Sequence, residues 1–197
     1  MKGALVGLGV VVAVILVAVL IYMGSYNGLV SRQENVNSKW SQVQNDYQRR
    51  ADLIPNLVNT VKGVAGFEKD TLTAVTEARA KVGTMQVNKD TLEDPAQFKK
   101  FEAAQGQLSS ALSRLMVVVE KYPELKATQN FSELQSQLEG TENRITVARR
   151  DFNEAAQDYN TAIRTVPTNI VAGMGGFKAR PYFEATAGSE KVPEVKF

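Results

Sequence analysis

The sequence begins with an apolar stretch, residues 4–23 (ALVGLGVVVAVILVAVLIYM), that contains no charged side chain. As an α-helix, twenty residues rise about 30 Å, the thickness of the hydrocarbon core of a bilayer. A secretory signal peptide has a shorter apolar core and a small-x-small cleavage site after it, whereas this stretch ends in Leu20-Ile21-Tyr22-Met23. We therefore predict a retained transmembrane anchor at residues 1–24, with the rest of the chain held at a membrane surface.

The composition excludes several classes of function. The chain carries 23 Lys and Arg against 21 Asp and Glu, interspersed along its length, so it lacks the basic surface of a nucleic-acid-binding protein. It contains no cysteine and no histidine. A Ser-His-Asp triad, a Cys-His pair, an H-E-x-x-H zinc site and a histidine kinase are therefore excluded. We predict a protein that is not an enzyme and that holds no metal or cofactor.

Beyond the anchor, apolar residues recur at alternating spacings of three and four, the period of an amphipathic α-helix. The pattern covers residues 36–64, 68–82, 98–122 and 131–166. The last segment keeps the alternation without a miss, which predicts a helix of about 35 residues, or about 50 Å. We expect an all-α fold, in which the N-terminal transmembrane helix is followed at residues 25–167 by an antiparallel, four-helix-bundle-like arrangement of long helices.

Pro55 interrupts the first of these patterns. Proline has no amide hydrogen, and its ring clashes with the carbonyl group four residues earlier, here that of Ala51. We therefore predict a helix kink at Pro55, or a corner near Asp52.

The fourth pattern ends at Pro167, and the remaining residues, 168–197, combine glycines, two prolines and scattered aromatic side chains. This composition predicts an irregular tail that either packs on the bundle or binds a partner. The candidate partner surface consists of Phe177, Tyr182 and Phe183.

Charged residues lie on or beside the apolar seams. Arg50 stands on the first seam between Tyr47 and Ile54, and a charge there is costly unless it is paired and hydrogen-bonded. We predict that Arg50 pairs with Glu68, Glu77 or Glu142 and so fixes the register of the helices. The predicted structural polar network comprises Arg50, Asp52, Glu68, Glu77, Arg79, Glu142 and Arg149.

Two other interpretations of the polar residues are weaker. The carboxylates could form a metal site, but di-iron bundles use Glu-x-x-His motifs and this sequence has no histidine. Four asparagines could orient a ligand, although such residues more often form hydrogen bonds between helices; they are Asn56, Asn59, Asn153 and Asn160.

Six ordered motifs give the sequence a family resemblance. They are YNGLV at 26–30, RRADLIPNLV at 49–58, EARA at 77–80, YPELKA at 122–127, TENRI at 141–145 and ARRDFN at 148–153. In these motifs the chain resembles the LemA family of bacterial membrane proteins. The resemblance implies one N-terminal membrane helix, a bundle of long helices, no established enzymatic activity, and genetic proximity to membrane proteases and phosphatase-like proteins. Phe67-Glu68 stands where the family pattern has His-Glu, so we assign no role to that position.

The leading functional hypothesis is a non-enzymatic protein that self-associates or scaffolds partners at the bacterial inner membrane. It would contact the bilayer through residues 4–23, where Gly7 and Gly9 allow neighbouring anchors to pack closely. The alternative is a ligand- or lipid-binding accessory or signalling protein that modulates a membrane protease, with a phosphatase-like protein as another partner. Lys2 and the amino terminus lie closer to the anchor than Arg32 and Lys39, which slightly favours a bundle outside the cytoplasm.

Overall fold

The computed structural model describes residues 2–64, 66–85 and 89–184. Within these ranges the chain forms helices and no strand, so the predicted all-α class is confirmed. The periodic segments of the sequence correspond to the four longest helices. In chain order the elements are α1 (Lys2–Lys62), α2 (Lys69–Gly83), the 3-10 helix η1 (Lys89–Leu92), α3 (Pro95–Val119), α4 (Pro123–Lys126), α5 (Gln129–Ala162) and α6 (Thr168–Gly175).

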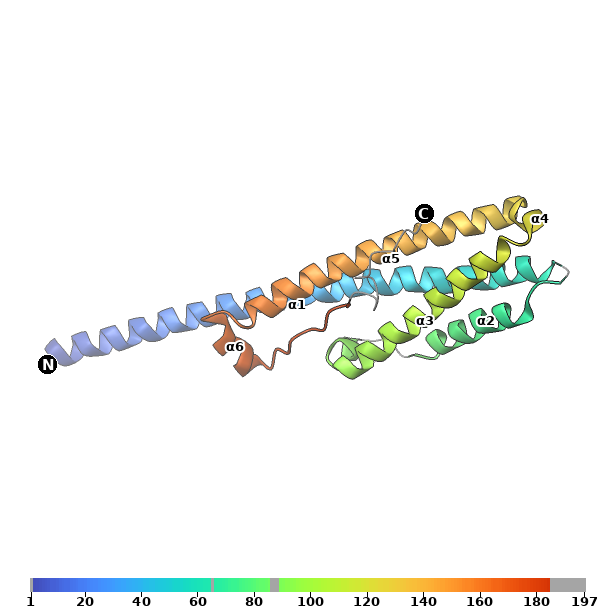
Figure 1. Cartoon of the computed structure of the whole chain (residues 1–197). Helices are drawn as coiled ribbons and strands as arrows, with labels where there is room; N and C mark the ends of the chain where they lie inside the picture. Colours follow the sequence, from blue (N-terminus) through green and yellow to red (C-terminus); the bar gives the residue numbers. More distant parts are fainter. Residues whose placement is uncertain (1, 65, 86–88, 185–197) are drawn as a thin grey trace, which may run out of the picture.

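Two antiparallel helix pairs make up the bundle (Figure 1). α1 and α5 lie side by side along most of the length of α5, and α2 and α3 form a shorter hairpin near the end of α1 that is distant from the N-terminus. α4 is a single turn between α3 and α5. The N-terminal part of α1 extends beyond all the other helices (Figure 1), so the molecule is a rod with one protruding helix.

α1 is 61 residues long and joins the apolar stretch to the bundle without a break. Among the described residues it is the one helix long and apolar enough to cross a membrane, and its most apolar window is not buried in the protein. A core helix of a soluble protein would bury such side chains. The boundary predicted at residue 24 falls inside this continuous helix, which neither Gly24 nor Gly28 interrupts.

The interior of the bundle contains two apolar clusters. The cluster nearer the apolar stretch is built around Trp40, whose ring contacts the rings of Phe98, Phe101, Phe152 and Phe183 at centroid distances of 5.3–6.1 Å. The distal cluster is mainly aliphatic and is formed by Ile54, Leu57, Val58, Val61, Leu72, Val75, Leu108, Leu112, Leu115, Val119, Leu125, Phe131 and Leu138. The apolar seams inferred from the sequence therefore face the core, except that α5 ends at Ala162 and Val166, at the end of the fourth pattern, is exposed.

α1 continues through Pro55 for seven residues, to Lys62, so the alternative of a corner near Asp52 is wrong. Proline leaves the Ala51 carbonyl oxygen without its usual amide donor. The Nε–H of Arg79, on α2, donates a hydrogen bond to this oxygen at 3.0 Å. A guanidinium group from a neighbouring helix thus replaces the missing backbone donor.

Replacing Arg79 with methionine is expected to lower the free energy of unfolding by about 1 kcal/mol, because the Ala51 carbonyl oxygen loses its donor. In a Pro55→Ala background the same replacement should cost less than half as much, since the alanine amide then donates to this oxygen. Urea unfolding of the four variants, followed by far-UV circular dichroism, gives the coupling between the two sites. Equal costs in the two backgrounds would show that Arg79 acts through other contacts.

The predicted irregular tail contains a helix. Thr168–Gly175 forms α6, which packs through Val171 and Ala172 against Leu29 of α1. The chain then runs without helical structure from 177 to 184, a segment we call the strap, along the cluster around Trp40. Residues 185–197 of the predicted tail lie outside the described residues.

Candidate functional site

A buried polar layer separates the two apolar clusters. It lies on α1 between Tyr47 and Ile54, which belong to different clusters, and its centre is the side chain of Arg50. Only 1% of Arg50 is exposed, which is rare for a charged residue. The three long helices α1, α3 and α5 each contribute at least one polar side chain to this layer, between the two apolar clusters.

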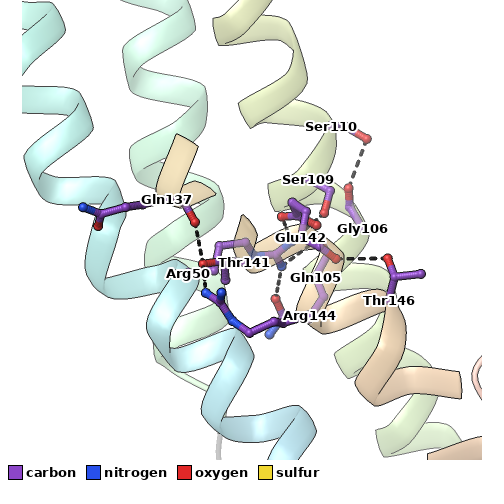
Figure 2. A network of polar contacts seen from close by, with 10 residues as sticks. All are labelled: Arg50, Gln105, Gly106, Ser109, Ser110, Gln137, Thr141, Glu142, Arg144 and Thr146. Atoms are coloured by element: carbon purple, nitrogen blue, oxygen red, sulfur yellow. Dashed lines mark hydrogen bonds and ion pairs between the residues drawn. The ribbon is translucent and has the colours of Figure 1, made fainter. Parts of the chain in front are cut away.

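The guanidinium group of Arg50 joins α1 to α3 and α5 (Figure 2). Its Nη1 donates to Ser109 Oγ and to Glu142 Oε1, both at 2.7 Å, and its Nη2 donates to Gln105 Oε1. Of the three partners predicted for Arg50, the structure places Glu142 against it, whereas Glu68 and Glu77 lie elsewhere. A single side chain on α1 therefore makes hydrogen bonds to residues of two other helices.

The two charged partners of this layer differ in their exposure to solvent. The Glu142 side chain is 43% exposed, so water hydrates the carboxylate while the cation is enclosed. Arg50 also lies over the ring of Tyr47, with its Cζ 5.0 Å from the ring centroid, which stabilises the buried charge further. Burial raises the pKa of the Tyr47 hydroxyl above its ordinary value, and the smaller opposing effects of Arg149 and Arg50 do not cancel it. Tyr47 is therefore neutral at physiological pH.

The other members of the predicted polar network are not joined to Arg50. Asp52 is exposed and accepts a hydrogen bond from Gln48 one turn earlier. Glu68 pairs with Lys121 at 3.3 Å, and Glu77 is exposed on α2. The sequence grouping therefore corresponds to several separate contacts, because charges on different turns of long helices lie far apart.

Arg149 connects α5 to α3 and to the strap. Its Nη2 donates to Glu102 Oε1 at 2.9 Å and to the backbone oxygen of Glu184 at 3.0 Å. Its guanidinium group also lies over the ring of Phe183, with Cζ 4.5 Å from the ring centroid. Arg149 thus fastens the end of the strap to the bundle.

Two asparagines on α5 hold the strap backbone. Asn160 donates to the carbonyl oxygen of Arg180 and accepts from its amide, both at 2.8 Å. Asn153, two helical turns earlier, makes the same pair of bonds with Phe183, both at 2.9 Å. An amide side chain carries both a donor group and an acceptor, so each asparagine satisfies both backbone polar groups of one strap residue.

The candidate partner surface is therefore wrong for one of its three residues. Phe183 is 6% exposed and belongs to the cluster around Trp40. Phe177 is half-buried against Tyr26, with ring centroids 5.6 Å apart. Tyr182 is exposed, and its hydroxyl oxygen accepts a hydrogen bond from Asn160.

A groove of about 660 Å³ opens beside the Arg50 layer, between α3 and α5. Its charged and hydroxyl lining includes Arg50, Glu102, Ser109, Glu142 and Arg149. A serine nucleophile requires a neighbouring base, but the Ser109 hydroxyl accepts a hydrogen bond from a guanidinium group. Among the residues that the structure describes, no group of three or more His, Cys, Asp or Glu could hold a metal ion. The groove is therefore lined by charged and hydroxyl groups, and its Ser109 hydroxyl is paired with a cation rather than with a base.

Sequence reasoning missed Gln105 as a partner of Arg50 and Glu93 as a partner of the tail. Gln105 had a usable signal, because it is a polar residue on the apolar seam of α3 between Phe101 and Leu108. Glu93 pairs with the buried Arg180 at 3.1 Å, and no local pattern links residues that are 87 positions apart.

Comparison with known proteins agrees with the motifs. The LemA family model matches residues 39–197. Magnetosome protein MamQ 2 of Paramagnetospirillum magneticum is 31% identical over 184 residues, which cover 85% of this chain and 68% of that protein. Magnetosome protein MamQ of Magnetospirillum gryphiswaldense is 30% identical with the same coverage. Protein LemA of Metamycoplasma hominis is 28% identical over 152 residues, which cover 77% of this chain and 65% of that protein. None of these names denotes an enzyme. The family model matches most of the chain, and the chain also has the six motifs and the apolar N-terminal helix. The chain therefore belongs to the LemA family of membrane-associated proteins.

Proposed function

We propose that this protein is a membrane-anchored helical scaffold that acts by associating laterally with copies of itself. The observation that carries the proposal is the continuity of α1, which joins the apolar stretch to the bundle as one helix of 61 residues. A flexible linker would let each bundle point in any direction. A continuous helix instead makes neighbouring bundles project in parallel whenever their anchors pack together.

The surface of the anchor suits such packing. Gly9 and Ala13 are four residues apart, so they share one face of α1, and both are exposed. Small residues at this spacing let two helices approach closely in a membrane. A Cβ added at Gly9 would meet no atom within 4 Å in the isolated chain, which leaves room for a neighbouring helix.

Disulfide cross-linking in membranes tests this arrangement, because the chain contains no cysteine of its own. We expect an Ala13→Cys variant of the full-length protein to form cross-linked dimers under mild oxidation. Ile15→Cys is the matched control, since Ile15 is also exposed but lies about 200° further around the helix. Gly9→Leu should reduce cross-linking at position 13. Equal cross-linking of the two variants, or a strictly monomeric protein in native membrane extracts, would contradict the proposal.

We place the scaffold in the bacterial inner membrane with its bundle on the extracytoplasmic side, on the basis of the charges that flank the anchor. Protease added to intact spheroplasts should then cleave the bundle. Survival of the bundle until the membrane is permeabilised would place it in the cytoplasm.

The groove between α3 and α5 supports a second candidate, an accessory protein that binds a polar ligand and modulates a membrane protease or a phosphatase-like protein. A neighbouring hollow of about 470 Å³ extends the groove toward Leu112, Met116 and Leu138. Its occupant would contact both the Arg50 layer and apolar side chains. Co-purification of a protease with the wild type, lost in a Ser113→Trp variant that fills the groove, would favour this function over self-association.

A further inference from the structure

α6 is held at the end of the bundle from which the apolar part of α1 protrudes (Figure 1). Its buried residues, Val171 and Ala172, pack against Leu29. The chain turns back at Gly176, which has a φ of 70°, so that the Phe177 ring packs edge-on against Tyr26. A Cβ on Gly175 would lie 2.6 Å from that ring, so glycine is required for this close contact.

The distance along α1 from the apolar stretch to the residues that α6 and Phe177 contact follows from helix geometry. Tyr26 and Leu29 are three and six residues beyond Met23, or about 5 and 9 Å along the axis of α1. The polar interfacial region on each side of a bilayer is about 5–8 Å thick. Tyr22 and Tyr26, whose rings stack at 6.1 Å, also mark this level, because tyrosine concentrates at membrane interfaces. If the apolar stretch spans a bilayer, Tyr26 lies within the headgroup region and Leu29, against which α6 packs, lies at its outer boundary.

The exposed side of α6 carries two large apolar side chains and no charged side chain, with Asn169 as its exposed polar residue. Ile170 and Met174 are four residues apart on the helix and are 62% and 75% exposed, and Val166, just before the helix, is 78% exposed. Residues 165–177 contain no charged side chain. In the described bundle beyond residue 30, the other large apolar side chains with high exposure are scattered singly: Val117 on α3, Val147 on α5 and Tyr182 in the strap.

We propose that α6 is an interfacial helix that inserts Ile170 and Met174 into the bilayer that the apolar stretch of α1 crosses. The occupant of its apolar face is lipid, because that face continues the surface of the apolar stretch at the correct depth. An uncharged segment needs no anionic headgroup, so neutral phosphatidylcholine is sufficient. The bundle then has two points of attachment, and the second prevents rotation of the rod about the axis of α1. This inference does not rest on self-association.

Single-cysteine labelling measures the depth of α6 directly. Ile170→Cys and Met174→Cys variants of the full-length protein would carry an environment-sensitive nitrobenzoxadiazole label, in phosphatidylcholine nanodiscs with one copy per disc. Val117→Cys is the matched control, because Val117 is 68% exposed but lies on α3. We expect lipids with a spin label near the headgroup to quench the two α6 positions about threefold more than position 117, as for an amphipathic helix at the interface.

Quenching at positions 170 and 174 that equals quenching at position 117 would overturn the proposal. A blue-shifted but unquenched label that appears only at higher protein density would also overturn it, because another copy of the chain would then cover α6. The emission of Trp40, the sole tryptophan, reports in each unlabelled variant that the bundle is folded. A protein that is monomeric in all membranes but quenched at position 170 would refute the scaffold and leave this inference standing.

Discussion

Replacing Glu142 with alanine is expected to lower the free energy of unfolding by about 3 kcal/mol, at the lower end of the cost of breaking a buried ion pair. The variant leaves the enclosed guanidinium group of Arg50 without its counter-charge, although Ser109 and Gln105 still accept hydrogen bonds from it. Urea unfolding of the full-length protein in detergent, followed by Trp40 emission and circular dichroism, measures the loss.

Replacing Arg50 with methionine should cost less, about 1–2 kcal/mol, although Arg50 is the more buried partner. The carboxylate that remains is 43% exposed and can be hydrated, and methionine fills part of the vacated volume. The Gln105 side chain, which is buried, then loses its donor, and this loss is the main cost. The double variant should therefore resemble Arg50→Met alone, with a coupling of about 3 kcal/mol between the two positions.

Asp52→Ala is the control for this series, because Asp52 lies on the same helix but is exposed. Its loss should change stability by less than about 0.5 kcal/mol. An Arg50→Met variant that is more stable than the wild type, with assembly intact, would show that Arg50 does not fix the register of the helices. A neutral Glu142→Ala variant would show that the ion pair contributes nothing.

Replacing both Asn153 and Asn160 with alanine should release the strap. The double variant removes four hydrogen bonds to the strap backbone, at about 1 kcal/mol each, so attachment of the strap should weaken by about 3–4 kcal/mol. Phe183 would then leave the cluster around Trp40, and water would enter. We expect a red shift of Trp40 emission and faster proteolysis between residues 177 and 184.

Asn56→Ala with Asn59→Ala is the matched control, because these two asparagines are exposed on α1. That variant should keep the Trp40 emission and the protease resistance of the wild type. Unchanged proteolysis of the Asn153 and Asn160 double variant would mean that packing of Phe183, rather than the amide bonds, holds the strap.

The seams of α1, α3 and α5 could be predicted because each spans several helical turns, over which the period of apolar residues is unambiguous. Short segments carry less information. α6 has only eight residues, two of them glycines, and packing against Leu29 stabilises it, so its own sequence predicted irregular structure. The passage of α1 through Pro55 likewise depends on a donor from α2, which a local rule for proline does not include.

The sequence predicted that Arg50 needs a partner, but it did not identify which residue that partner is. An arginine on an apolar seam requires a partner, but the choice among three glutamates depends on how antiparallel helices slide along each other. The structure sets α5 so that Glu142 reaches Arg50 across 92 positions of sequence. The burial of Phe183 is similar, because it depends on where the strap crosses α5 and not on any pattern around the residue.

Because α1 is continuous, any tilt of its apolar part also tilts the rest of the helix and the bundle attached to it. Lys62, the last residue of α1, lies 39 residues beyond Met23, or about 60 Å along the helix. A tilt of about 20°, the average for membrane helices, moves the far end sideways by about 20 Å. If the apolar stretch spans a bilayer, membrane thickness sets this tilt, because an apolar stretch tilts further when the bilayer is thinner. A change of a few ångströms in bilayer thickness would then move the distal end of the bundle sideways by a larger distance.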